Sequence, residues 1–103
     1  MEISVTQKND TARFVFQGDI DEKGAALLSR RFQELDNKKS IRELVLDFQK
    51  VGYIGSSGIG LLILFYQTLA STGGKVRIEK VPAAIYDLFM ELDIQTILSV
   101  SKA

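Results

Sequence analysis

The sequence predicts one small α/β domain, built as a four-stranded mixed β-sheet with helices mainly on one face. Runs of alternating apolar and polar residues, typical of strands, are separated by segments with apolar residues three and four positions apart, typical of helices. The expected order is β-β-α-β-α-β-α. Because the later strands are each joined by a helix, they should run parallel with right-handed crossovers. A chain of 103 residues is long enough to bury a single core.

Two short strands are expected at the start of the chain. Ile3 and Val5 alternate with polar residues, and residues 14–16 form a second run that ends near Gly18. The turn between them, at residues 9–10, is short. It therefore predicts an antiparallel hairpin.

The first helix is expected to follow Asp21, which is a suitable N-cap residue. Leu28, Phe32 and Leu35 recur at helical spacing and predict the buried stripe of this helix. Residues 37–40 form a polar break after it. The single domain is expected to span residues 1–103.

The third strand is predicted at residues 44–48, and a long helix follows at about residues 57–72. Gly73 and Gly74 come directly after that helix and are a typical C-terminal signal.

The fourth strand alternates Val76 and Ile78 with charged residues, which predicts one wet face and helices mainly on the other. Pro82 fits the first turn of a third helix. Residues 94–100 are apolar and fit either a short edge strand or a helical turn. The apolar stripe expected for the third helix consists of Ile85, Leu88, Phe89 and Leu92.

The composition excludes several classes of function. With 13 basic and 13 acidic side chains the formal net charge is zero, which argues against nucleic acid or an anionic membrane as a partner. The absence of Cys excludes disulfides, and the absence of His removes the commonest metal ligand and general base. No signal peptide is visible, and the longest apolar run is short of the roughly 20 residues that cross a bilayer. We expect a cytoplasmic protein.

The segment Gly-Ser-Ser-Gly-Ile-Gly at residues 55–60 lies where a strand ends and a helix begins. Helix N-termini at such junctions bind anions. The spacing fits neither a nucleophile elbow nor a P-loop nor a dinucleotide fingerprint, and no His is present to activate a serine. We therefore interpret Ser56 as a residue that is phosphorylated, with a simple N-cap as the alternative. Ser57 is expected inside the first helical turn, bonding locally.

The end of the second strand should bring acidic residues close to this junction. Asp19, Asp21 and Glu22 follow that strand, and parallel strands end at the same edge of a sheet. These side chains could bind a divalent cation, but capping of the first helix is favoured. No metal or cofactor is expected.

The long helix is apolar on most of its sides. Ile59, Leu62 and Tyr66 share one face, whereas Leu61, Leu64 and Phe65 fall largely outside it. Such a helix is either sandwiched inside the protein or presents a patch to a partner, and we favour the patch.

Together these segments resemble the STAS-domain anti-sigma-factor antagonists. The resemblance covers residues 14–98. It includes Gly18-Asp19-Ile20-Asp21 after the second strand, the serine pair with Gly58-Ile59-Gly60, Gly73-Gly74-Lys75-Val76, and Val81-Pro82-Ala83 with the helix that follows.

The resemblance implies that Ser56 is the phosphoacceptor of a non-enzymatic partner-switching regulator. A partner with a histidine-kinase-like ATP site, serving as serine kinase and anti-sigma factor, phosphorylates it; a PP2C-type phosphatase reverses this, and only the unphosphorylated form binds the partner. The output is sigma-factor release or another pathway, such as secretion or exopolysaccharide and biofilm control. Expected partner-binding residues are Asp19, Asp21, Gly55, Ser57, Gly58, Leu61, Leu64 and Phe65.

The chain departs from the family at Gly55, where Asp is common, and so loses a carboxylate beside the acceptor. Asp21 remains to order the site. Relatives often add a helix after the position of Ala103, which is expected to leave the region of Leu61, Leu64 and Phe65 more exposed or to change the partner. Two other hypotheses stay open: an unphosphorylated STAS scaffold subunit of a lipid-transport or stress-sensing complex, and a small hydrolase.

Overall fold

The computed structural model describes residues 1–103 and contains a five-stranded sheet with three α-helices and two single-turn 3-10 helices. None of the helices has the length and apolar composition needed to cross a bilayer. The elements are β1 (Glu2–Lys8), β2 (Thr11–Ile20), α1 (Glu22–Gln33), η1 (Lys38–Ser40), β3 (Glu43–Ile54), α2 (Ser56–Ala70), β4 (Lys75–Val81), α3 (Ala83–Glu91), η2 (Ile94–Thr96) and β5 (Ser99–Lys102).

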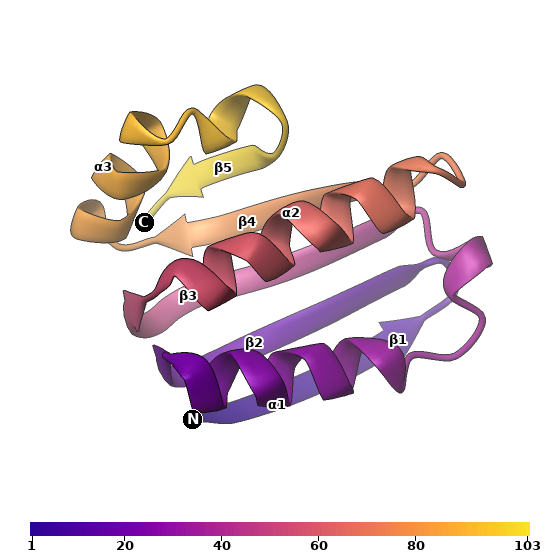
Figure 1. Cartoon of the computed structure of the whole chain (residues 1–103). Helices are drawn as coiled ribbons and strands as arrows, with labels where there is room; N and C mark the ends of the chain where they lie inside the picture. Colours follow the sequence, from indigo (N-terminus) through magenta and orange to yellow (C-terminus); the bar gives the residue numbers. More distant parts are fainter.

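The sheet is mixed, and its spatial order follows the chain, β1-β2-β3-β4-β5 (Figure 1). β1 runs antiparallel to β2, as the short turn predicted, and the remaining neighbours are parallel. The prediction of four strands was wrong, because β5 adds a fifth at the edge. Residues 94–100 contain both candidate structures, the helical turn η2 and the start of β5.

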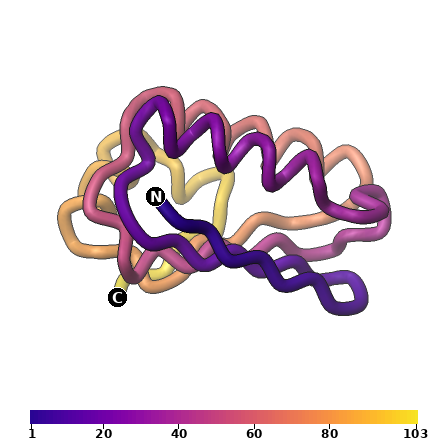
Figure 2. The backbone as a smooth tube through the Cα atoms, turned by 90° about the horizontal axis from the view of Figure 1, so that it is seen from below, coloured from indigo at the N-terminus to yellow at the C-terminus, as the bar shows by residue number.

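All three α-helices lie on one side of the sheet. Figure 2 shows α1 and α2 side by side above the strands. Aromatic rings fill the space between the layers: Phe48 lies 5.3 Å from Phe16 and 6.0 Å from Phe89, measured between ring centroids. Phe32 of α1 stacks on Phe65 of α2 with ring centroids 4.1 Å apart. The core therefore joins all three helices to the sheet.

Two local predictions about helix ends are confirmed. Asp21 is the N-cap of α1, and its carboxylate accepts a hydrogen bond of 2.8 Å from the amide of Gly24. After α2, Gly73 has a φ of +84°, which favours glycine, and the Gly74 amide donates to the Leu69 carbonyl at 2.7 Å. These ends fix where α2 starts and stops relative to the sheet.

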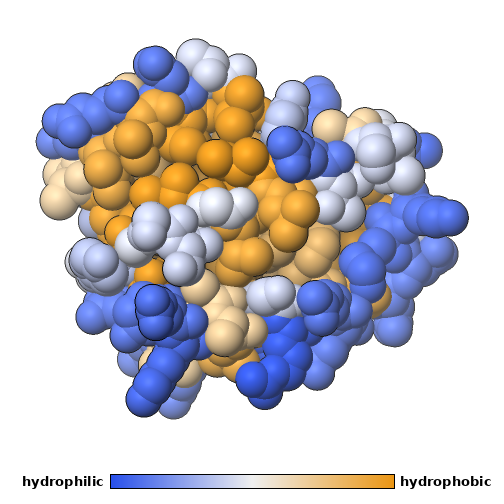
Figure 3. Space-filling view, viewed as in Figure 1, coloured by the Kyte–Doolittle hydropathy of each residue, from blue (hydrophilic) through white to orange (hydrophobic).

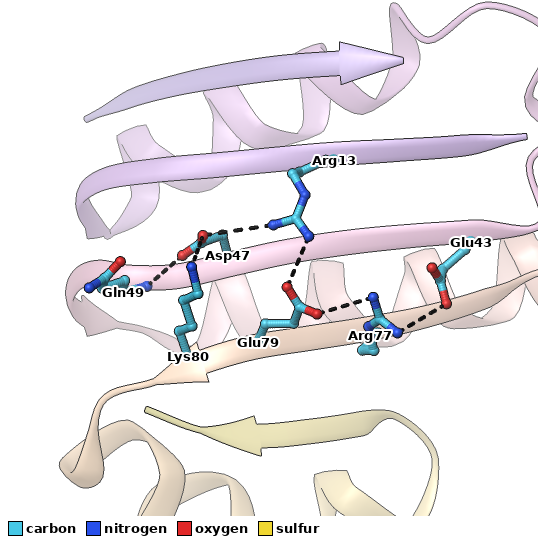
Figure 4. Close-up of polar contacts among 7 residues, drawn as sticks. All are labelled: Arg13, Glu43, Asp47, Gln49, Arg77, Glu79 and Lys80. Atoms are coloured by element: carbon cyan, nitrogen blue, oxygen red, sulfur yellow. Dashed lines mark hydrogen bonds and ion pairs between the residues drawn. The ribbon is translucent and has the colours of Figure 1, made fainter. Parts of the chain in front are cut away.

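The face of the sheet opposite the helices carries a network of ion pairs (Figure 4). Arg13 lies 3.8 Å from Asp47 and 3.1 Å from Glu79, and Lys80 lies 3.6 Å from Asp47. Arg77 lies 3.1 Å from Glu79. Asp47 is buried among these cations, on the strand that leads to Ser56. The network keeps this face polar, as the alternation in β4 predicted.

Candidate functional site

The serine pair lies where β3 passes into α2. Gly55 is the N-cap of α2, so Ser56 is the first residue of the helix and begins it one position earlier than predicted. The Gly55 amide donates to the carbonyl of Ile20 at 3.0 Å, which ties this loop to the end of β2. Since Gly55 has no side chain, the cap makes no side-chain hydrogen bond. The N-cap of α2 is therefore Gly55 and not Ser56, in contrast to the alternative expected from the sequence.

The N-terminus of α2 has backbone amides without intrahelical partners. The first such bond runs from the Ile59 amide to the Gly55 carbonyl at 3.1 Å. The amides of Ser56, Ser57 and Gly58 precede it, and the first turn holds no acidic residue. The helix dipole adds a partial positive charge at the same place. A phosphate on this turn would meet a favourable local field.

A hollow of about 220 Å³ opens beside the serine pair. Its lining confirms that the end of β2 and the start of α1 approach this turn. A second hollow of about 370 Å³, next to it, is lined in part by Asp19, Asp21 and Lys23. The first hollow is lined by Asp21, Glu22, Tyr53, Gly55, Ser56 and Ser57.

Ser56 and Ser57 are both exposed, so both hydroxyls are open to solvent. Ser57 lies inside the first turn, as predicted. The expected local hydrogen bond of its hydroxyl is not formed. Position within the turn, rather than bonding, is what distinguishes the two serines.

Gly58 was expected to belong to the partner-binding surface, but it is buried. A β-carbon at position 58 would lie 2.7 Å from Cγ2 of Ile20 and 2.8 Å from Cγ1 of Ile54. Both isoleucines belong to the core. Gly58 therefore lets the first turn of α2 pack directly on the ends of β2 and β3, which places Ser56 and Ser57 at the sheet edge.

The predicted patch on α2 needs one correction. Phe65 is 1% exposed and faces α1, where it stacks on Phe32, so it is a core residue. Leu61 is half-buried, and Leu64 is 50% exposed. Helix α2 is thus sandwiched along one side and open along the other, which combines the two alternatives left by the sequence.

The open side of α2 forms a stripe that begins at the serine pair. Ser57, Gly60 and Leu64 are exposed and follow at spacings of three and four, so they share a face. Leu64 is seven residues from Ser57, or about 10 Å along the axis. Figure 3 shows apolar side chains gathered over α2 and α3 on this side of the molecule. We call Ser57, Gly60 and Leu64 the α2 stripe.

Two of the acidic residues near the site, Asp21 and Glu22, lie at the start of α1. No group of three possible metal ligands comes together anywhere in the structure. The Asp21 carboxylate accepts a hydrogen bond from the Gly24 amide. Glu22 lies in the first turn of α1, where a carboxylate complements the helix dipole. The geometry therefore supports the capping interpretation for Asp21 and Glu22.

Tyr53 is a residue of this site that the sequence did not reveal. It lies near the end of β3, is 54% exposed, and lines the hollow together with Ser56. A tyrosine in a strand is usually explained by packing. One sequence signal was Gly55, two positions along the chain, which leaves space above the backbone.

Comparison with known proteins agrees with the geometry. The STAS domain family model matches residues 2–103. Among solved structures, the Bacillus anti-sigma factor antagonist SpoIIAA in its unphosphorylated form has a TM-score of 0.79 at 14% identity, covering 99% of this chain and 89% of its own. An anti-sigma-factor antagonist domain protein from Planctomyces limnophilus has a TM-score of 0.78 at 16% identity, covering 98% of this chain and 90% of its own.

A third similar structure comes from a different kind of protein. The STAS domain of a SulP transporter from Vibrio cholerae has a TM-score of 0.71 at 18% identity, covering 95% of this chain and 77% of its own. At such identities these likenesses describe the fold. Since the family model spans nearly all of its residues, the chain belongs to the STAS domain family.

Proposed function

We propose that this protein is a non-enzymatic, cytoplasmic partner-switching regulator controlled by phosphorylation of Ser56. A serine kinase of the anti-sigma-factor type adds the phosphate, and a PP2C-type phosphatase removes it. The observation that carries the proposal is an exposed serine in the first turn of α2, where no side chain caps the helix, at the head of the α2 stripe. The output is sigma-factor release or another regulated pathway, such as secretion or exopolysaccharide and biofilm control.

The comparisons support the phosphorylation step by likeness. SpoIIAA is an anti-sigma factor antagonist with structures in unphosphorylated and phosphorylated forms, and both share this fold, with TM-scores of 0.79 and 0.76. The phosphorylated form covers 96% of this chain at 12% identity. A fold of this kind thus tolerates a phosphate, as the geometry of α2 also suggests.

The partner-binding surface that we propose surrounds Ser56. It contains the exposed Ser57 and Leu64, the half-buried Leu61, the backbone at Gly55, and the acidic turn at Asp19 and Asp21. Small residues at the start of α2 let a partner approach the backbone closely, and Leu64 offers an apolar contact about two turns away. Phe65 and Gly58 contribute through the core instead.

Phosphate on Ser56 would change this surface without unfolding the protein. It adds about −1.5 to −2 charges and three acceptor oxygens. The free amides of α2 favour the added charge within the chain. A partner shaped around a small neutral hydroxyl would meet bulk, a desolvation cost and a concentration of negative charge with Asp21 and Glu22. A penalty of about 3 kcal/mol weakens binding more than a hundredfold.

The serine is proposed as a substrate rather than a nucleophile because the chain offers nothing to activate it. No His or Cys is present in the sequence, and the side chains that share the hollow with Ser56 are carboxylates, a phenol and a second serine. The Asp21 carboxylate serves α1 as its N-cap and accepts a hydrogen bond from the Gly24 amide through Oδ1. We propose no catalytic residues and no cofactor.

Intact-mass analysis of protein isolated from its native host tests the proposal. A fraction of the wild-type chain should carry the mass of one phosphoryl group, which phosphatase treatment removes. Ser56→Ala should abolish this species, and Ser57→Ala should retain it. Phosphate found mainly on Ser57 would reassign the site. A chain that is never phosphorylated under any growth condition would replace our proposal with the scaffold-subunit function.

A further inference from the structure

Tyr53 lies across the bare backbone of Gly55. A β-carbon at position 55 would be 3.1 Å from the Tyr53 hydroxyl oxygen and 3.5 and 3.6 Å from Cε2 and Cζ of its ring. The phenol therefore reaches over the N-cap of α2 at a distance that the absence of a side chain allows. The residue is still 54% exposed, so the ring is open to the hollow as well as to solvent.

The side chains around this hollow differ in whether they would repel a phosphate or donate a hydrogen bond to it. Asp21 and Glu22 are carboxylates and repel it. Asp19 and Lys23 line the neighbouring hollow rather than this one. Apart from the serines themselves, Tyr53 is the one lining side chain with a hydrogen to donate. The phenol, the Ser57 hydroxyl and the first-turn amides of α2 are thus the donors available to a phosphate on Ser56.

We propose that Tyr53 is a positioning residue for the phosphorylated state, its hydroxyl donating a hydrogen bond to the phosphoryl group on Ser56. This inference rests on the proposed function for the identity of the modified serine. Gly55 also contributes to this arrangement, because its lack of a side chain leaves room for the phenol above the N-terminus of α2. The phosphate is then held between the amides of α2 and the phenol, facing the two carboxylates.

The proposed hydrogen bond from Tyr53 can be tested without knowing the kinase. Phosphoserine is incorporated genetically at position 56 of the full chain, and its second pKa is measured by phosphorus NMR during a pH titration. A hydrogen bond from a donor favours the dianion over the monoanion, because charge-assisted bonds strengthen with charge. Tyr53→Phe removes the donor and keeps the ring, so it should raise this pKa by about half a unit.

Tyr66→Phe is the matched control. It also removes a tyrosine hydroxyl, but from a residue of α2 that lies ten positions after Ser56, or about 15 Å along the helix axis. The pKa of phosphoserine 56 should be unchanged by it. Circular dichroism checks that each variant is folded.

Gly55→Ala supplies an independent second variant. The backbone at Gly55 is extended, with φ −97° and ψ −178°, so alanine is allowed there without backbone strain. Its β-carbon crowds the hydroxyl at 3.1 Å and should displace the phenol, raising the pKa as Tyr53→Phe does. In the Tyr53→Phe background the ring carbons at 3.5 and 3.6 Å are ordinary contacts, so Gly55→Ala should add no further shift.

An unchanged pKa in folded Tyr53→Phe would overturn the proposal, as would additive shifts in the double variant. Because phosphoserine is supplied directly, this outcome is separate from the fate of the proposed function. If Tyr53→Phe raises the pKa of phosphoserine 56 but Ser56 carries no phosphate in the host, the hydrogen bond from Tyr53 stands and the proposed regulation by phosphorylation is rejected.

Discussion

Gly58 and Gly60, two glycines of α2 only half a turn apart, should respond oppositely to alanine. A β-carbon at position 58 would lie 2.7 and 2.8 Å from carbons of Ile20 and Ile54, more than half an ångström inside ordinary contact. Both isoleucines are buried at 4% exposure or less, so neither can move away freely. At Gly60 nothing lies within 4 Å of the same atom.

The magnitudes follow from these surroundings. Overpacking a core costs typically 1–3 kcal/mol, and the better helix propensity of alanine returns up to about 1 kcal/mol. Gly58→Ala should therefore lower the free energy of unfolding by about 1–2 kcal/mol. Gly60→Ala meets no such cost and should raise that free energy by about 0.5–1 kcal/mol.

Urea denaturation followed by circular dichroism measures both effects. With an m-value of about 1.5 kcal/mol per M, the midpoint should fall by roughly 1 M for Gly58→Ala and rise by about half as much for Gly60→Ala. Equal m-values for the two variants would show that the same unfolding transition is compared. If both variants shift in the same direction, the close packing of α2 on the ends of β2 and β3 is refuted.

Phe65→Ala should lower the free energy of unfolding by about 3–5 kcal/mol, because it removes a buried ring stacked on Phe32, whereas Leu64→Ala, on the exposed side of the same helix, should cost less than about 1 kcal/mol. Thermal and urea unfolding distinguish these outcomes, and equal costs would contradict the orientation of α2. Asp21→Ala should cost about 1 kcal/mol through loss of the 2.8 Å bond to the Gly24 amide, and Asp21→Asn should recover most of it. If both Asp21 variants lose the same free energy of unfolding in this assay, the charge of Asp21 rather than its capping hydrogen bond stabilises the helix.

Much of the fold could be predicted because the sequence patterns are local. The alternation in Val76 and Ile78 revealed a strand with one wet face, and Gly73 and Gly74 marked the end of α2. Strand β5 could not be distinguished from a helical turn because it is only four residues long and pairs with β4 at the sheet edge through Ser99, Val100 and Lys102. Its partner strand, rather than its own pattern, decides its structure.

The site could be placed from the sequence, but the orientation of its helix could not. The strand-to-helix junction located Ser56, and the rule for parallel strands brought Asp21 beside it. Periodicity alone did not show that α2 packs against both the sheet and α1, which is why Phe65 was expected on the surface. The contact of Tyr53 with the space above Gly55 depends on how the chain turns between β3 and α2.

The ion pairs of the open sheet face were also beyond the sequence patterns. Asp47 interrupts an apolar run, and its partners come from two other strands, Arg13 on β2 and Lys80 on β4. Lys80 reaches it from a backbone with φ +55°, at a shift in register between Ile78 and Val81. The two consecutive polar residues Glu79 and Lys80 interrupt the alternation of β4 at this bulge, but they do not reveal which carboxylate Lys80 reaches.

Phosphate on Ser56 is proposed to control the binding of a protein partner, and this can be measured directly. The partner is first captured from a lysate of the native host with Ser56→Ala, and its affinity is then measured by calorimetry for the unmodified chain and for the chain carrying phosphoserine 56. Circular dichroism confirms that both forms are folded. We expect phosphate to weaken binding more than a hundredfold, which corresponds to about 3 kcal/mol. Equal affinities of the two folded forms would contradict it.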